Sequence, residues 1–125
     1  MTKQIKFNEL PALGQPFAGG TFAGITTHQN GTHVAVVLLP DQASDVTWQA
    51  AMDWAKGLDA VLPSRPVAAL LFANLQPSLR PEWHWTSDEY SASFAWYCYF
   101  LNGTQYDTHK SCEGSAVAVR LVEVV

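Results

Sequence analysis

Charge is scarce in this sequence, and positive charge is the scarcest. Charged residues make up 14% of the 125 positions, and seven Lys and Arg stand against eleven Asp and Glu, for a formal net charge of -4. The basic residues form no run, so we expect no nucleic-acid partner bound through phosphate contacts. The hydrophobic fraction of 48% argues against disorder and gives a single domain enough apolar material for a core.

Long apolar runs are also missing. No stretch approaches the eighteen or so apolar residues that a membrane-spanning helix needs, so we expect no membrane partner. The first twenty residues lack the apolar core of a signal peptide. We therefore expect a protein made in the cytoplasm, with export as part of a larger particle left open.

Cysteine is limited to Cys98 and Cys112. In a reducing compartment two thiols are the favoured interpretation, with at least one of them buried. A disulfide across a hairpin is geometrically possible, and both alternatives stay open. His109 precedes Cys112 by three residues, but structural metal sites pair their ligands more closely, and we expect no metal here.

The N-terminal third of the chain predicts an arm followed by two strands. Residues 1–18 have little periodicity and are predicted to form an N-terminal arm, ahead of a single domain over residues 19–125. Thr21–Thr27 is β-branched and aromatic, which favours a strand. Asn30-Gly31 indicates a hairpin turn. The next segment, His33–Pro40, is apolar on both faces and predicts a central strand that ends at Pro40.

The middle of the chain changes to helical periodicity. Five apolar residues recur on one helical face, and they are Trp48, Ala51, Trp54, Ala55 and Leu58. Asp45 or Thr47 can cap this helix. A second helix is predicted from the Ser64 cap, with Pro66 in its first turn, to Pro77. It is apolar nearly all round, so we expect it to be buried.

The last third is predicted to be β-structure rich in aromatic residues. Residues 81–100 hold eight of the fifteen aromatic residues of the chain. Trp83–Ser87 is predicted to form a short strand, the Asn102-Gly103 turn closes a hairpin, and Ala116–Val125 forms the last strand. In the hairpin's first arm, alternation places two sets on opposite faces, namely Phe94, Trp96, Cys98 and Phe100 on one and Ala95, Tyr97 and Tyr99 on the other. The fold class is α+β, with two central helices and antiparallel sheets.

Several segments in this order resemble a known family. They read GGTFAGI, TWQAAMDWAKGL, LPSRPVAALLFANL, WHWTSDEYSASFAWYCYF and AVAVRLV. Residues 19–122 resemble a bacterial and phage domain of unknown function, similar to the C-terminal domain of collagen-like adhesins of the Lcl type. The resemblance implies a C-type-lectin-like fold in which the first and last strands pair, so that Thr21–Thr27 would lie beside Ala116–Val122.

The resemblance also implies roles for the aromatic residues. Trp85, Trp96 and Phe100 match the core aromatics of the family. Four tyrosines are then the candidates for exposed binding residues, because a tyrosine combines a large contact area with a polar tip. They are Tyr90, Tyr97, Tyr99 and Tyr106.

Catalytic patterns are absent from the sequence. There is no Gly-x-Ser-x-Gly elbow, phosphate loop or dinucleotide fingerprint. The four histidines are dispersed, and His84, between two Trp in an alternating strand, is predicted to be a surface or hydrogen-bonded residue. Asp88 and Glu89 lack the further oxygen ligands that calcium requires, so they predict a solvated turn. We expect no enzyme activity, no catalytic residue, no metal and no cofactor.

The function expected is a non-catalytic recognition domain, encoded by a phage or prophage. It would bind a protein or glycan ligand through the C-terminal half, with Asp88 and Glu89 beside the four tyrosines. One alternative is a structural subunit of a phage particle, at the tail tip or as a head decoration. Another is a small acidic phage protein that inhibits a host factor. By analogy with adhesin heads, a homo-oligomer, such as a trimer, is possible.

Overall fold

The structure is a computed structural model that describes residues 3–125, in which two helices pack against one large mixed sheet. The predicted α+β class is confirmed. The elements in chain order are β1 (Gln4–Ile5), η1 (Phe7–Glu9), β2 (Pro16–Phe17), β3 (Gly20–Thr27), β4 (His33–Val46), α1 (Trp48–Gly57), α2 (Arg65–Leu75), η2 (Gln76–Ser78), β5 (Trp83–Glu89), β6 (Phe94–Tyr99), β7 (Gln105–His109) and β8 (Gly114–Val124).

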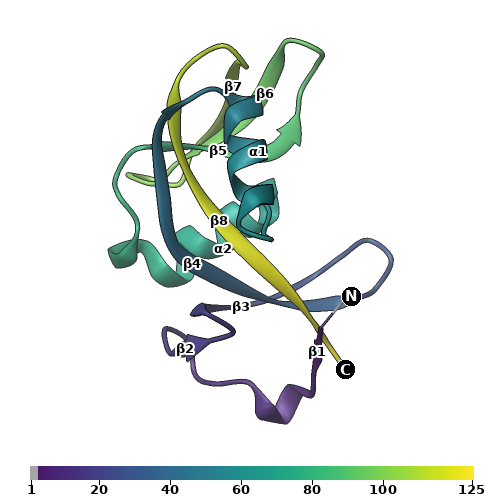
Figure 1. Ribbon diagram of the computed structural model, residues 1–125. Helices are drawn as coiled ribbons and strands as arrows, with labels where there is room; N and C mark the ends of the chain where they lie inside the picture. Colours follow the sequence, from purple (N-terminus) through teal and green to yellow (C-terminus); the bar gives the residue numbers. More distant parts are fainter. Residues whose placement is uncertain (1–2) are drawn as a thin grey trace.

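Strand β8 is the centre of the sheet (Figure 1). The strand order is β2-β3-β4-β8-β5-β6-β7, and β1 pairs with the far end of β8. Most neighbours are antiparallel, as predicted, but β5 and β1 both run parallel to β8. The long strands β4 and β8 cross the whole molecule, so they connect the end that carries both termini to the end that carries the β5–β6–β7 hairpins.

The predicted pairing of Thr21–Thr27 with Ala116–Val122 is wrong. Strand β4 lies between them, and its Val37 pairs with Phe22 on one side and with Arg120 on the other. The cause is local, because the Asn30-Gly31 turn joins β3 directly to β4, with Gly31 at a φ of 89°, and forces these two strands into a hairpin. The strand that pairs with β8 from the N-terminus is β1, through Gln4 and Glu123.

The segment predicted as an N-terminal arm packs on the sheet over its described part. Residues 1 and 2 of that arm lie outside the described residues. Strand β1 extends the edge of β8, and β2 pairs with β3. Ile5, Leu10 and Phe17 cover a buried cluster formed by Phe22, Ala35, Val37 and Val122.

Strand β4 is longer than predicted. Its first half is central, and residues 34–39 are buried, as expected, whereas His33 is exposed. Pro40 does not end it, because the strand continues to Val46. Proline has no N–H to donate, but the pairing with β8 is already interrupted between Leu38 and Gln42. The missing donor therefore costs no ladder hydrogen bond.

Both helices begin where the sequence predicts. Thr47 caps α1, with its Oγ1 accepting a hydrogen bond from the Ala50 N–H at 3.3 Å. Asp45, the alternative cap, lies outside the helix in the left-handed region, with a φ of 56°. Ser64 caps α2 by accepting from the Val67 N–H. The prediction that α2 is buried all round is only half right, because Pro66 and Ala69 are exposed.

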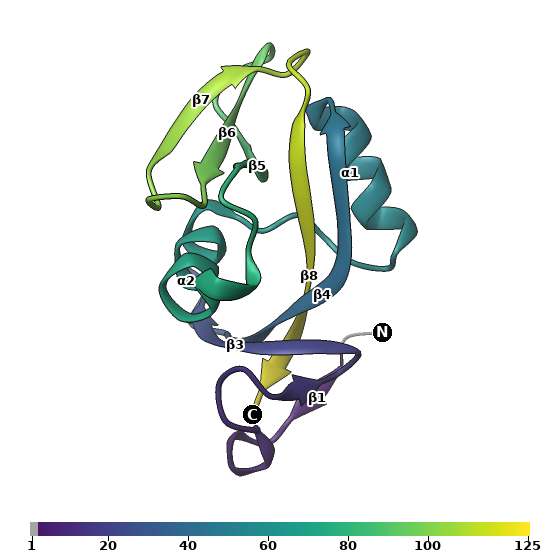
Figure 2. The same ribbon diagram turned by 90° about the vertical axis from the view of Figure 1, so that its left-hand side faces the viewer.

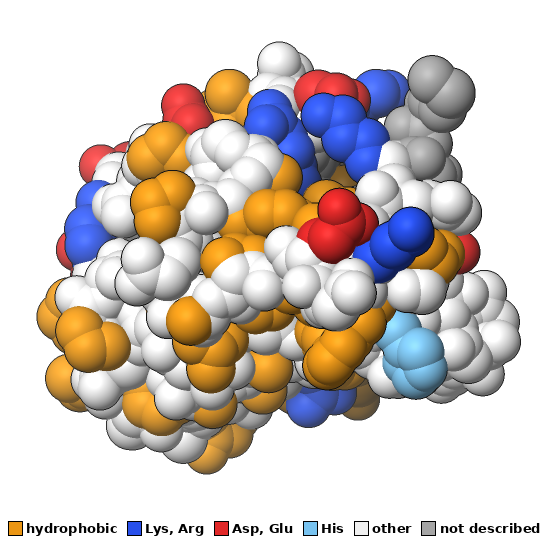
Figure 3. All heavy atoms as spheres, turned by 90° about the horizontal axis from the view of Figure 1, so that it is seen from below, with side chains coloured by type: hydrophobic (Ala, Val, Ile, Leu, Met, Phe, Trp, Pro, Cys, Tyr) orange, Lys and Arg blue, Asp and Glu red, His pale blue; other side chains and the backbone are white. Residues whose placement is uncertain are grey.

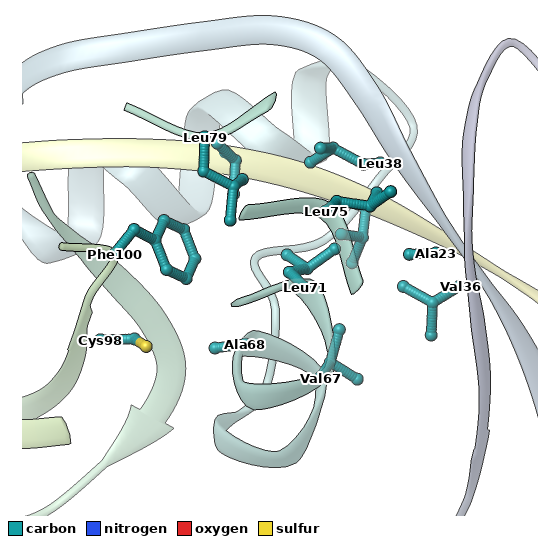
Figure 4. Packing of buried hydrophobic residues seen from close by; sticks show 12 residues of the cluster. Ala23, Val36, Leu38, Val67, Ala68, Leu71, Leu75, Leu79, Cys98 and Phe100 are labelled. Atoms are coloured by element: carbon teal, nitrogen blue, oxygen red, sulfur yellow. The ribbon is translucent and has the colours of Figure 1, made fainter. Parts of the chain in front are cut away.

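The two helices cover opposite faces of β8 (Figure 2). Alternation along a strand sends successive side chains to opposite faces. Val117 and Val119 therefore join Leu71, Leu75 and other residues of α2 in one buried cluster, whose close packing Figure 4 shows. Ala116 and Ala118 join α1 in a second cluster, where their small side chains leave room for two tryptophans, Trp48 and Trp85.

Neither helix of the described chain is long and apolar enough to cross a membrane.

A pair of glycine substitutions tests the packing of the second cluster. A Cβ on Gly114 would overlap the indole ring of Trp83, whereas a Cβ on Gly57 would meet nothing within 4 Å. We expect Gly114→Ala to lower the free energy of unfolding by about 1–3 kcal/mol through overpacking. Gly57→Ala should be neutral or stabilise the fold by up to about 1 kcal/mol, since it lies at the end of a helix. Urea unfolding followed by tryptophan fluorescence measures both, and equal stability of the two variants would contradict the packing.

Candidate binding face on the β5–β6–β7 hairpins

The aromatic segment is divided between the two faces of the sheet formed by β5, β6 and β7. The predicted alternation along β6 is confirmed, because Cys98 and the following Phe100 join the α2 cluster while Ala95 and Tyr97 join the α1 cluster. A helix covers part of each face, so Ala95 and Cys98 are both fully buried. The aromatic side chains beyond the reach of the helices remain on the surface.

Four aromatic residues lie together on the face that α1 partly covers. We call this set the aromatic face, and it consists of Trp83, Tyr97, Tyr99 and Tyr106. The ring centroids of Trp83 and Tyr97 are 5.1 Å apart, and those of Tyr97 and Tyr106 are 6.4 Å apart. Tyr99 is the cross-strand partner of Trp83. Three of the four predicted tyrosines are therefore neighbours. Tyr106 is 58% exposed, as predicted, but Tyr97 and Tyr99 are partly buried, which corrects the expectation that they are exposed.

Buried tryptophans anchor the inner edge of this face. Trp85 packs edge-on against Trp83, with ring centroids 5.0 Å apart. Its indole N–H donates to the carbonyl oxygen of Val46 at 2.9 Å, and the Trp48 indole N–H donates to the carbonyl oxygen of Thr86 at 2.9 Å. Buried Trp N–H groups need such partners. These two bonds tie the hairpins to the end of β4 and to α1, so the aromatic face rests on a fixed base.

Tyr90 belongs to the other side of the sheet. It is 61% exposed, as predicted, and packs edge-on against Trp96. The expectation that Trp96 is a core residue is wrong, since it is only partly buried. The guanidinium of Arg65 lies 3.6 Å above the centre of its ring, and this cation–π contact takes the place of core packing. Trp85 and Phe100, the other two predicted core aromatics, are fully buried.

Asp88 and Glu89 have structural partners. Asp88 Oδ2 accepts a hydrogen bond from the Arg65 N–H at 2.7 Å, which holds the first turn of α2 to β5. Glu89 forms an ion pair with Lys110. Both acids line an open depression of about 870 Å³ together with Arg65, Trp96 and Gln105. They are thus neighbours of Tyr90 and not of the other three tyrosines.

Sequence reasoning missed an acidic hollow beside the aromatic face. Asp45, Glu82 and Glu113 come from three distant segments, and with Trp83 and Tyr99 they line a hollow of about 290 Å³. Glu82 accepts a hydrogen bond from the Ser115 hydroxyl at 2.7 Å. That bond, with the nearby charge of Arg80, lowers the pKa of Glu82. The pairing of β4 with the start of β8 creates this group, and no local spacing in the sequence signals it.

His84 is neither at the surface nor fully hydrogen-bonded, which corrects the prediction. It is 1% exposed, and its ring packs against Phe100. Nδ1 lies 2.8 Å from the carbonyl oxygen of Glu82, whereas Nε2 has no hydrogen-bond partner among the described residues. Burial lowers the pKa of His84 to about 4, so the ring is neutral at physiological pH.

The two cysteines are free thiols in separate clusters. Cys98 is buried beside α2, where burial raises the pKa of its thiol. Cys112 packs at the edge of the α1 cluster, with Sγ 3.5 Å from the Thr108 hydroxyl. Within residues 3–125, no three His, Cys, Asp or Glu side chains come close enough together to hold a metal ion.

No protein-family model matches this chain, and no curated protein shows significant similarity to it. The resemblance to C-type-lectin-like domains therefore stays a prediction.

The buried His84 predicts a loss of stability in mild acid. Its pKa is about 4 in the folded chain and near 6.5 when unfolded, so the unfolded state binds more protons between these values. Stability is then full above about pH 6.5 and falls as the pH falls toward 4. We expect the free energy of unfolding to drop by about 2 kcal/mol from pH 7 to pH 5, before most carboxylates titrate.

Urea titrations at both pH values measure this drop. His84→Gln removes the titrating group and should flatten the pH dependence, whatever its effect on stability at pH 7. His109→Gln, which changes an exposed ring on the same hairpins, should keep the drop because His84 is intact. If the free energy of unfolding of His84→Gln still falls from pH 7 to pH 5 as in the wild type, a group other than His84 causes the pH dependence.

Proposed function

We propose that this chain is a non-catalytic recognition domain that binds a protein or glycan ligand through the aromatic face. The observation that carries the proposal is the grouping of Trp83, Tyr97, Tyr99 and Tyr106 on one face of the sheet. The ring centroid of Tyr97 lies 5.1 Å from that of Trp83 and 6.4 Å from that of Tyr106. Tyr106 is exposed and the other three are partly exposed, and aromatic surface that lies side by side is costly to leave in water. They gain contact area when a partner covers them.

The rigidity of the face favours binding over packing alone. The hydrogen bonds of Trp85 and Trp48 fix the strands beneath it. Ring contacts with Trp83 and Tyr106 restrict the rotamers of Tyr97 before a ligand arrives. Tyrosine and tryptophan supply large contact areas at a low cost in conformational entropy. The hydroxyl tips of the tyrosines add hydrogen bonds that can orient the ligand.

The position of His84 supports a role without catalysis. It is the histidine inside the β5–β6 pair, but its ring points into the α2 cluster against Phe100 and away from Trp83. A general base must reach the proton that it removes. A buried ring on the opposite face from the aromatic residues cannot reach a ligand bound there.

The opposite end of the molecule provides an internal control surface. Seen from below, hydrophobic side chains are interleaved with polar atoms, and acidic and basic side chains mix along one edge (Figure 3). Phe7 is 67% exposed in this N-terminal region. It offers an exposed aromatic ring outside the aromatic face.

Substitution of one partly buried and one exposed tyrosine, Tyr97 and Tyr106, tests the proposal. A ligand is first selected with the wild-type protein from a peptide-display library and from a glycan array. We expect Tyr97→Ala and Tyr106→Ala to weaken its binding by at least about tenfold each, as for a central interface residue. Phe7→Ala should leave the affinity unchanged. Calorimetric titration gives the dissociation constants, and unfolding curves verify that each variant is folded.

A ligand that binds the tyrosine variants as tightly as the wild type would refute the aromatic face as the binding surface.

A further inference from the structure

The aromatic face ends in a hollow whose walls are rings and carboxylates. Trp83 and Tyr99, cross-strand partners on β5 and β6, form part of its wall. Asp45, Glu82 and Glu113 complete it, and all three are exposed. Gly114 lies directly against the Trp83 ring, so the absence of a side chain there sets the position of the indole in the hollow.

The negative charge of this hollow is not balanced by its own surroundings. The nearby cation is Arg80, whose Nε lies 3.7 Å from Glu82 Oε1. Its two terminal amino groups donate elsewhere, to the Ser44 hydroxyl at 2.8 Å and to the Ala43 carbonyl oxygen at 3.1 Å. The three carboxylates therefore have one nearby positive charge, and most hydrogen bonds of that guanidinium go to β4.

The spacing of the carboxylates favours an organic cation over a metal ion. The three acids do not form a group close enough to share one ion, within the part of the chain that the structure describes. An organic cation is larger and can contact acids that lie on different sides of it. Aromatic rings attract such a cation by its charge, with the strongest attraction for tryptophan.

We propose that this hollow receives a lysine or arginine side chain of a protein partner that docks on the aromatic face. The inference rests on the proposed function and deepens it, because it names the chemistry of the ligand. The charge complementarity is direct: a basic side chain would enter a hollow lined by the carboxylates of Asp45, Glu82 and Glu113 while its stem lies along Trp83 and Tyr99. The apolar rest of the partner surface would cover Tyr97 and Tyr106.

The site can be tested with small cations, without knowledge of the partner. The probes are the capped peptides acetyl-Gly-Arg-Gly-amide and acetyl-Gly-Lys-Gly-amide, with the citrulline peptide as a neutral analogue of the arginine one. We expect both cations to shift the NMR resonance of the Trp83 indole N–H in a saturable way, and more weakly as salt rises. The citrulline peptide should cause no saturable shift. Equal shifts with citrulline would overturn the inference.

Two aspartates give a matched pair of variants. Asp45 and Asp59 both have a φ of 56° and both are exposed, and asparagine tolerates this conformation as aspartate does. We expect Asp45→Asn to weaken arginine binding by about threefold or more, and Asp45→Asn with Glu113→Gln by about tenfold. Asp59→Asn removes the same charge outside the hollow and should not change the affinity. Equal losses in both aspartate variants would reduce the effect to net charge and overturn the site.

The two proposals fail in distinguishable ways. In one outcome, Tyr106→Ala loses affinity for the selected ligand, that ligand carries no cation, and the arginine probe leaves the Trp83 resonance unshifted. The recognition function then stands and the basic partner is refuted. If the arginine probe binds in the hollow while the tyrosine variants keep full affinity for the selected ligand, the cation site stands and the aromatic face is refuted as its extension.

Discussion

Strand β8 is the constraint on which the rest of the structure depends. It is buried along most of its length and bonded at both edges, to β4 along one and to β5, β1 and the Val61 bridge along the other. Because its backbone is paired at both edges and most of its side chains are buried, the size of these side chains determines what can pack on each face. Valines at 117 and 119 fill the space beneath α2, and alanines at 116 and 118 leave room for Trp48 of α1 and Trp85 of β5. The small residues of one face thus decide where the large aromatic residues of another segment can lie.

Local features of the fold were predictable from the sequence because each has a local cause. Thr47 and Ser64 cap their helices through contacts three residues away, and the Asn-Gly dipeptides set their turns by backbone conformation alone. The pairing of distant strands was not predictable in this way. The resemblance implied that Thr21–Thr27 lies beside β8, but the short turn after β3 gives that place to β4. The prediction that Pro40 ends the strand was wrong for a related reason. A proline ends a strand only where its missing N–H would have paired with the neighbouring strand, and β8 does not pair with β4 at that position.

In the candidate site, too, the features with a local cause were predictable and those that depend on strand pairing were not. Alternation along β6 predicted that Tyr97 and Tyr99 share a face, and the exposure of Tyr90 and Tyr106 followed from residue type. The sequence pattern does not give the register between strands. That register places Tyr106 beside Tyr97, whereas Tyr90 packs against Trp96 on the other face. Asp88 and Glu89 looked free in the sequence, yet Arg65 and Lys110, 23 and 21 residues away, engage them. Asp45, Glu82 and Glu113 had no common signal at all.

The aromatic residues of segment 81–100 therefore have two physical roles. Those that the helices cover form the core, and those farther from the helices reach the surface. At the inner edge, Trp85 and Phe100 are fully buried, and the Trp85 N–H is bonded to β4. Two residues before Trp85, Trp83 already reaches the surface, because Gly114 leaves its ring room and no helix covers it completely. The same alternation that builds the core thus extends a row of rings beyond it. A row anchored in this way keeps its position at the surface, so the proposed partner would find it already formed, and the carboxylates at its end would favour a basic partner.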